Sequence, residues 1–310
     1  MKIQVSFLAL FLALVVWMQP AVVRAADEAE IVATLERISG PVNVMHQDDT
    51  KVINGRNGLL LKSGDTVSTG PQGQATIKFR DGSELRVFPN TTFRVDQIKE
   101  SQAKSRNFRY NMNMKLGAVW GNFARQRQSV EIKTPTATIG IKGTTLRVAE
   151  RNDHAQVSLT EGAIDVSNDK GTLALTPGKQ LTTFSRKDDL AGKVQDIPLK
   201  LTLKADVDKL TFDKGQAAQA KVIIQLVDVK RGENAARSGP IYLRSNYDRV
   251  NFPAQVTLDD KGYARMTLTF DAPQPSDAAL EGNIYVWAVM DRESDADVGE
   301  GRLLFSFPST

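Results

Sequence analysis

Residues 75–88 read ATIKFRDGSELRVF, and apolar and charged residues alternate on both sides of the central Asp81-Gly82 pair. The apolar positions are Ile77, Phe79, Leu85 and Val87, and the charged positions are Lys78, Arg80, Glu84 and Arg86. Successive side chains of a strand point to opposite faces, and Asp-Gly is a favoured turn between antiparallel strands. The stretch therefore predicts a β-hairpin that buries its apolar face and turns its charged face outward.

The same alternation continues toward the carboxyl terminus. It includes residues 130–133 and 139–148, and two further hairpins are predicted around the turns Glu161-Gly162 and Pro177-Gly178. Glycine inside a strand marks a bulge or a bend, so we expect residues 139–148 to form one bent strand. No long helix is indicated. We predict an all-β first domain over residues 31–190, arranged as a sandwich, with a jelly roll or a short β-solenoid as alternatives.

A second domain is predicted at residues 197–310, after a polar stretch between residues 186 and 198 that has no strand period. Alternating runs resume at residues 199–203, 221–229, 241–245, 255–258, 263–270, 283–290 and 303–307. Seven short strands in about 115 residues favour an immunoglobulin-like sandwich. We expect the large side chain of Trp287 to lie at the centre of its core.

The amino terminus predicts export. An apolar run of roughly 14 residues follows Lys2, which is shorter than the ~20 residues that a membrane-spanning helix needs. Ala25 and Val23 are small residues of the kind that signal peptidase accepts, so residues 1–25 are predicted to be a cleaved signal peptide. An uncleaved anchor is the alternative. With cleavage, the protein is expected to be periplasmic or secreted and not an integral membrane protein.

Composition excludes several classes of function. The chain has no cysteine, so it has no lipoprotein anchor, disulfide or thiolate chemistry. The predicted leader carries two of the 40 basic residues and none of the 36 acidic ones, which leaves the mature chain with 38 minus 36, or a net charge of +2. This charge gives no indication of a nucleic-acid partner, and export argues against one.

Candidate catalytic and metal-binding residues are few. His46 and His154 are the only histidines, and no Gly-x-Ser-x-Gly motif accompanies them. Acidic residues alternate near the carboxyl terminus at Asp291, Glu293, Asp295 and Asp297. Their spacing could suit Ca²⁺, but the stretch lacks the glycine and flanking helices of a calcium loop, so a solvated connection is favoured. We expect no enzyme activity, no metal and no cofactor.

One segment suggests a ligand. Residues 94–127 contain eight basic residues against two acidic ones, together with aromatic residues. The predicted ligand-binding patch consists of Arg109, Tyr110, Trp120, Arg125 and Arg127. Guanidinium groups grip phosphates and carboxylates bidentately, and polysaccharide would stack on the aromatic rings. The alternative is a flexible loop with its aromatic residues in the core.

Several segments of the first domain carry a resemblance to a known family. They are ISGPVNV (38–44), LKSGDTVSTG (61–70), IKFRDGSELRV (77–87), IKTPTATIGIKGTTLRV (132–148) and VSLTEGAIDV (157–166). In this order the set resembles the FecR-like domain family over roughly residues 31–185. Within the set, the Gly143-Thr144 pair has the most weight. The second domain is similar to bacterial immunoglobulin-like repeats through VTLDDKGYARMTLTF (256–270).

Two functions are therefore open. The first is a non-enzymatic binding or assembly module of the cell envelope, whose partner is an envelope protein or an anionic polysaccharide, since function on such folds is usually carried by loops. The alternative follows from the resemblance, because FecR-like domains of known role are periplasmic parts of regulators that relay a receptor's signal to a sigma factor. Under this alternative the chain is an accessory periplasmic component of FecR-type signalling. The sequence identifies neither the ligand nor the oligomeric state.

Overall fold

A computed structural model describes residues 31–307, except 48, 50, 100–107, 125–129, 213–214, 254, 275–282, 293 and 296. The predicted signal peptide lies outside these residues. In the described part of the chain, no helix combines the length and apolar character needed to cross a membrane.

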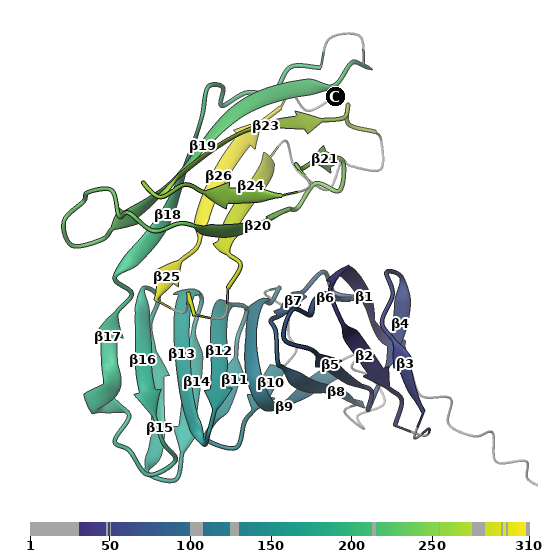
Figure 1. The fold of residues 1–310 in the computed structure, drawn as a ribbon, viewed down its shortest axis with the longest axis vertical. Coiled ribbons are helices and arrows are strands. Elements are labelled where there is room, and N and C mark those ends of the chain that lie inside the picture. Colours follow the sequence, from purple (N-terminus) through teal and green to yellow (C-terminus); the bar gives the residue numbers. More distant parts are fainter. Residues whose placement is uncertain are drawn as a thin grey trace, which may run out of the picture. The chain divides into compact units, whose positions relative to one another are not determined.

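The N-terminal half, residues 31–196, is built from two β-sheets (Figure 1). Sheet A contains β1 (Ile31–Ser39), β4 (Leu59–Lys62), β6 (Gln74–Phe79), β7 (Glu84–Val87), β12 (Thr145–Arg151), β13 (His154–Glu161), β16 (Lys179–Phe184) and β17 (Val194–Asp196). Sheet B contains β2 (Val42–Met45), β3 (Val52–Asn54), β5 (Thr66–Thr69), β8 (Thr92–Lys99), β10 (Val130–Lys133), β11 (Thr138–Ile141), β14 (Ile164–Asn168) and β15 (Gly171–Leu175). The long strand β9 (Phe108–Asn122) belongs to both sheets.

The predicted hairpin is confirmed as β6 and β7, which pair antiparallel from Ala75 opposite Val87 to Lys78 opposite Glu84. Gly82 in the turn has a φ of +84°, a value that glycine adopts without strain. The four apolar side chains of the hairpin are buried, as their alternation predicts. The charged side of the hairpin differs from the prediction, because Arg86 is only 6% exposed.

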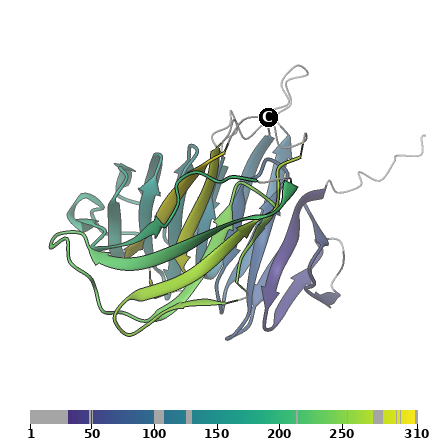
Figure 2. The same ribbon diagram turned by 90° about the horizontal axis from the view of Figure 1, so that it is seen from above.

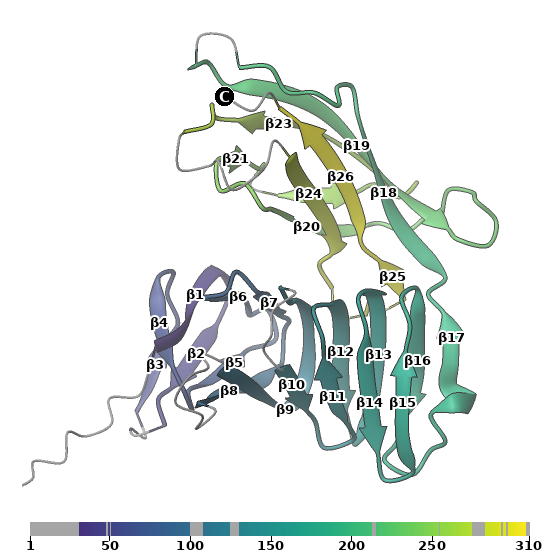
Figure 3. The ribbon, with the colours of Figure 1, turned by 180° about the vertical axis from the view of Figure 1, so that it is seen from behind.

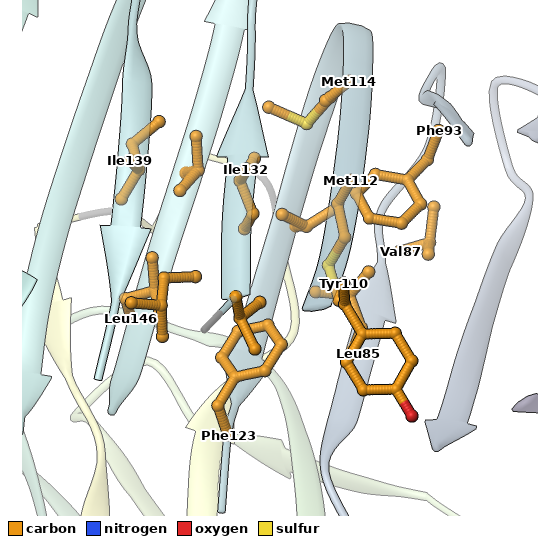
Figure 4. Packing of buried hydrophobic residues seen from close by; sticks show 14 of the residues in the cluster. Leu85, Val87, Phe93, Tyr110, Met112, Met114, Phe123, Ile132, Ile139 and Leu146 are labelled. Carbon is orange, nitrogen blue, oxygen red and sulfur yellow. The ribbon is translucent and has the colours of Figure 1, made fainter. Parts of the chain in front are cut away.

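The core of the N-terminal half lies between sheets A and B. Figure 4 shows side chains from both sheets meeting there, among them Leu85 and Leu146 of sheet A and Ile132 and Ile139 of sheet B. Burying an aliphatic side chain of this size stabilises a fold by about 1.5–3 kcal/mol. Because the chain has no disulfide, this burial holds the two sheets together.

Strand β9 passes from sheet B to sheet A. Its first part pairs with β8 and β10, and its last part, from Gly117 to Asn122, pairs with β7 and β12. Gly117 has a φ of +104° at the crossing. The Thr91 hydroxyl accepts a hydrogen bond from the Ala118 amide at 3.0 Å and donates one to the Ala118 carbonyl at 3.2 Å. A glycine is required here because a side chain at position 117 would overlap Thr91.

The prediction of one bent strand over residues 139–148 is wrong. Thr138–Ile141 forms β11 in sheet B, and Thr145–Arg151 forms β12 in sheet A. Gly143, with a φ of +66°, lies in the connection that carries the chain between the sheets. Alternation continues across the connection because both strands face the same core.

The described strand pairs of both sheets are antiparallel, except for β9 with β10. Figure 3 shows β12, β13 and β16 side by side in this arrangement. Hairpins that alternate between two facing sheets form a sandwich, whereas a parallel β-solenoid would stack parallel strands. The predicted all-β sandwich is thus confirmed over its solenoid alternative.

The C-terminal half, residues 199–307, is a second pair of sheets, drawn in green and yellow in Figure 2. One sheet has the order β21 (Val250–Asn251), β23 (Tyr263–Phe270), β19 (Ala218–Asp228), β18 (Leu199–Ala205) and β25 (Val298–Gly299). The other has the order β22 (Val256–Leu258), β20 (Gly239–Ser245), β24 (Asn283–Met290) and β26 (Gly301–Ser306). A separate apolar core lies between them. The classification of this half as immunoglobulin-like remains a prediction.

Trp287 does not lie in this core, contrary to the prediction. Its neighbours Val286 and Ala288 on β24 are fully buried in the core, so the strand alternation turns the indole to the opposite face. The two halves belong to one compact unit.

We predict that Gly117→Ala destabilises the protein by about 2–4 kcal/mol, because it adds a clash to an unfavourable backbone conformation. The new Cβ would lie 2.2 Å from Thr91 Oγ1 and 2.4 Å from Thr91 Cα. Urea unfolding measures the effect. Gly82→Ala is the matched control, since Gly82 also has a positive φ but no atom within 4 Å of its Cβ position, and should cost about 1 kcal/mol. Equal losses for the two variants would contradict the account of the crossing.

Candidate functional site

The outer face of sheet A is buried where it meets the C-terminal half. Trp120 of β9 and Arg147 of β12 are each 3% exposed although they point away from the N-terminal core. A small apolar cluster fills the contact, and it consists of Phe88, Ala118, Trp120, Tyr242 and Val289. The first three come from the N-terminal half and the last two from β20 and β24. We refer to this contact, with the arginine side chains described below, as the arginine joint.

Arg86 makes the central ion pair of the joint. Its Nε donates to Asp291 Oδ1 at 3.0 Å and its Nη2 donates to Asp291 Oδ2 at 2.9 Å. The Nη2 atom also donates to Gln74 Oε1 at 2.8 Å, and the Nη1 atom donates to the Arg37 carbonyl at 3.2 Å. A guanidinium that is bidentate to a carboxylate fixes orientation as well as distance. Arg86 therefore aligns β7 with the end of β24.

Arg147 makes a second link from sheet A. Its Nη2 donates to the Met290 carbonyl at 2.6 Å, and its Nη1 donates to the Arg292 carbonyl. The guanidinium lies 4.7 Å from the centre of the Phe88 ring, a distance at which cation–π attraction operates. Arg147 thus satisfies backbone carbonyls at the end of β24.

Arg244 reaches the joint from the C-terminal half. Its guanidinium carbon lies 3.9 Å from the centre of one Trp287 ring and 5.4 Å from that of Trp120. Its Nε and Nη2 atoms are buried and make no hydrogen bond with the residues that the structure describes. Burial lowers the pKa of Arg244, and the nearby carboxylates of Glu300 and Glu84 oppose this shift.

Glu300 is the acidic partner of this buried region. Burial raises its pKa to about 7, although Arg244 lowers it and a hydrogen bond with Thr145 of β12 also lowers it. Its Oε2 atom has no hydrogen-bond partner among the described residues. A buried polar atom without a partner costs roughly 1–3 kcal/mol. The joint is consequently more polar and less well satisfied than the two cores.

Two clefts flank the joint. One, of about 890 Å³, lies beside β18 and includes Glu161, Glu300 and Leu201 in its lining. The other, of about 770 Å³, lies between the end of β1 and the loop after β21, and includes Arg37 and Phe252. Both clefts are lined by residues of the two halves, so each depends on the joint for its shape.

The structure separates the two described aromatic residues of the predicted ligand-binding patch. Tyr110 is 4% exposed and packs against Phe79, with 5.3 Å between ring centres, and Trp120 lies in the joint. Neither ring is available to stack on a polysaccharide, which corrects the aromatic part of the prediction. Arg109 pairs with Ile98 through its backbone in β9, and its side chain lies outside the described residues. Arg125 and Arg127 lie outside them too.

The other residues considered from the sequence have local partners. His46 Nδ1 lies 2.9 Å from Asp65 Oδ2, and His154 is exposed, with Nδ1 2.9 Å from the Asn152 carbonyl. Asp297 accepts two hydrogen bonds from Arg237, each at 2.8 Å. No group of three potential metal ligands occurs within the described part of the chain. Glu293 falls outside that part.

Sequence reasoning missed the four arginines of the site, namely Arg37, Arg86, Arg147 and Arg244. The alternation places Arg86 and Arg147 on the outer face of sheet A, and an outer charged residue is ordinarily solvated. Only the second sandwich buries them, and strand periodicity carries no information about which surface covers an outer face.

Residues 65–165 match the model of a family described as FecR protein. The match extends from the start of β5 into β14, and it therefore lies within the N-terminal half. Two crystal structures of a candidate anti-sigma factor from Parabacteroides distasonis are similar to the chain at 16% identity and a TM-score of 0.33. Each similarity covers 42% of this chain and 57% of that one, so this chain spans little more than half the length of that protein. No curated protein matches the chain.

A double-mutant cycle of Arg86→Gln and Asp291→Asn should give a coupling free energy of about 2 kcal/mol, because the pair is bidentate and largely buried. Urea unfolding of the full chain measures it. Lys142 and Asp165, which pair at 3.0 Å with side chains 72% and 43% exposed, provide the control cycle. We expect the control to give less than about 1 kcal/mol. A coupling at Arg86 no larger than the control would mean that the ion pair does not hold the joint.

Glu300→Gln should flatten the dependence of stability on pH. The pKa of Glu300 is about 7 in the folded chain, against an ordinary value of 4.5, so the folded state binds more protons between these values. The contribution of Glu300 to stability is therefore complete below pH 4.5 and is lost as the pH rises through 7, by on the order of 2–3 kcal/mol. Urea unfolding at pH 5 and pH 8 measures the difference. Identical pH profiles for the variant and the wild type would refute this assignment.

Proposed function

We propose that this protein is an exported, accessory component of a FecR-type trans-envelope signalling system, and that it acts by binding a partner protein without catalysing a reaction. The observation that carries the proposal is the FecR match at residues 65–165. FecR-like domains of known role relay the state of an outer-membrane receptor to a sigma factor, and such a relay works through contacts between proteins.

The geometry of the joint supports a binding role. The arginine side chains that could serve a reaction are engaged in holding the two halves, as Arg86 is with Asp291 and Arg147 is with the Met290 carbonyl. An acyl- or phosphoryl-transfer site would require a nucleophile, a base and oxyanion donors that converge on one point. Neither His46 nor His154 takes part in the joint or in a nucleophile–base pair that the structure describes.

A protein partner is favoured over an envelope polysaccharide. Sugar rings bind to exposed aromatic faces, and the burial of Tyr110 and Trp120 removes the two described rings of the predicted patch. Export is part of the proposal and follows from the leader predicted at residues 1–25. The assembly module remains the competing function, because it could use the same surfaces without affecting transcription.

Deletion of the gene in its native bacterium should alter the transcription of a defined set of genes, and the intact gene should restore it. RNA sequencing under envelope stress and iron limitation measures the effect. A gene whose product lacks the predicted signal peptide, residues 1–25, should fail to restore transcription, because the protein would remain in the cytoplasm. An unchanged transcriptome together with a defect in envelope integrity would reject signalling in favour of the assembly module.

A further inference from the structure

Arg37 occupies an unusual place at the mouth of the 770 Å³ cleft. It has a φ of +48°, which a residue with a side chain adopts at a cost of about 1 kcal/mol or more. The pairing of β1 with β6 shifts register between Glu36 and Ser39, so Arg37 lies in a β-bulge. Bulges redirect side chains, and this one directs Arg37 across the cleft toward β20.

The guanidinium of Arg37 is held in position there. Its Nη1 donates to the Leu243 carbonyl at 2.7 Å, and its central carbon lies 5.2 Å from the centre of the Tyr242 ring and 6.0 Å from that of Phe252. The Arg37 carbonyl is fixed in turn by Arg86. An arginine that is fixed before a ligand arrives loses little conformational entropy on binding.

Arg37 has no acidic partner among the residues that the structure describes. The cleft also contains Arg86 and Asp291, and these two neutralise each other. The lining of the cleft therefore carries one positive charge, that of Arg37, which no acidic residue of the lining compensates. Because Nη1 is the only atom of this guanidinium with a hydrogen bond to a described residue, the edge formed by Nε and Nη2 is available for a bidentate acceptor.

The walls of the cleft favour a peptide as the source of that acceptor. Strands β21 and β22 border the cleft at Asn251 and Val256, and each pairs with a single described neighbour, so each has an open edge. An extended peptide can add to such an edge through main-chain hydrogen bonds. The rings that a sugar would need are already covered, since guanidinium groups lie over Tyr242 and Phe252.

We propose that the Arg37 cleft binds an aspartate or glutamate side chain on an extended segment of a partner protein. The carboxylate takes the free edge of the Arg37 guanidinium, and the backbone of the segment lies along β21 or β22. The kind of partner rests on the proposed function, whereas the site rests on the contacts of Arg37.

The test uses the full mature chain and a library of random octapeptides displayed on phage. Binders selected with the wild-type protein should be enriched in aspartate and glutamate. One of these peptides, made synthetically, should bind Arg37→Gln roughly tenfold more weakly, which corresponds to the loss of a charge-assisted bidentate contact. Replacing its acidic residue by the amide should weaken binding to the wild type by a similar factor, and this second measurement needs no protein variant.

Arg265→Gln is the matched control, because Arg265 is exposed and lies 5.9 Å from the Tyr263 ring on β23, outside the cleft lining. It should leave peptide binding unchanged. Selection without acidic enrichment, or equal binding by Arg37→Gln and the wild type, would overturn the proposal. Arg37-dependent binding of oligogalacturonate but not of peptides would assign the carboxylate to a polysaccharide and would also overturn it. Peptide binding without any transcriptional change would instead remove the signalling role and leave the site intact.

Discussion

The arrangement of this protein depends on one constraint, namely that burying a charged side chain costs free energy unless the covering surface supplies partners for it. Arg86 and Arg147 point out of the N-terminal sandwich, and the C-terminal sandwich covers them with Asp291 and with main-chain carbonyls. In the opposite direction, Arg244 of the C-terminal sandwich places its guanidinium close to the indole rings of Trp120 and Trp287. Because guanidinium hydrogen bonds are directional, these contacts define one orientation of the two sandwiches, which a purely apolar contact would specify less sharply. The shapes of the two clefts beside the joint depend on that orientation, because residues of both sandwiches line each cleft.

The N-terminal sandwich, which includes the segment similar to the FecR family, supplies the surface on which this joint is built. Its strand β9 is common to both sheets, and the crossing at Gly117 places Ala118 and Trp120 in sheet A, under the C-terminal half. The crossing and the connection at Gly143 are therefore positions where the backbone conformation decides which side chains face outward. A shift of one residue at either point would exchange the core and joint faces of the following strand. The set of side chains that face the joint thus depends on the backbone conformation at Gly117 and Gly143.

The sequence allowed many of the strands to be predicted, because a two-residue period and an Asp-Gly turn are local signals. The β6–β7 hairpin and the strands of the C-terminal half follow from these signals. The hairpins predicted around Glu161-Gly162 and Pro177-Gly178 are wrong, since these turns connect β13 to β14 and β15 to β16, which lie in different sheets. The sheet change between β11 and β12 could not be predicted, since the alternation on both sides of Gly143 is the same whether the strand bends or crosses. Trp287 and Trp120 were misplaced for a related reason. Periodicity separates two faces of a strand, but the identity of the covering surface is a long-range property.

The most direct test of the central claim is the distribution of distances between the two sandwiches in solution. The chain has no cysteine, so Lys78→Cys and Asp248→Cys would provide unique sites for spin labels at positions whose native side chains approach to 3.7 Å across the contact. Pulsed electron–electron double resonance should give a single, narrow distribution of distances between the two spin labels, centred at a short distance. It should broaden when Arg86→Gln is added. A broad or long distribution with Arg86 intact would show that the sandwiches are not held by the arginine joint.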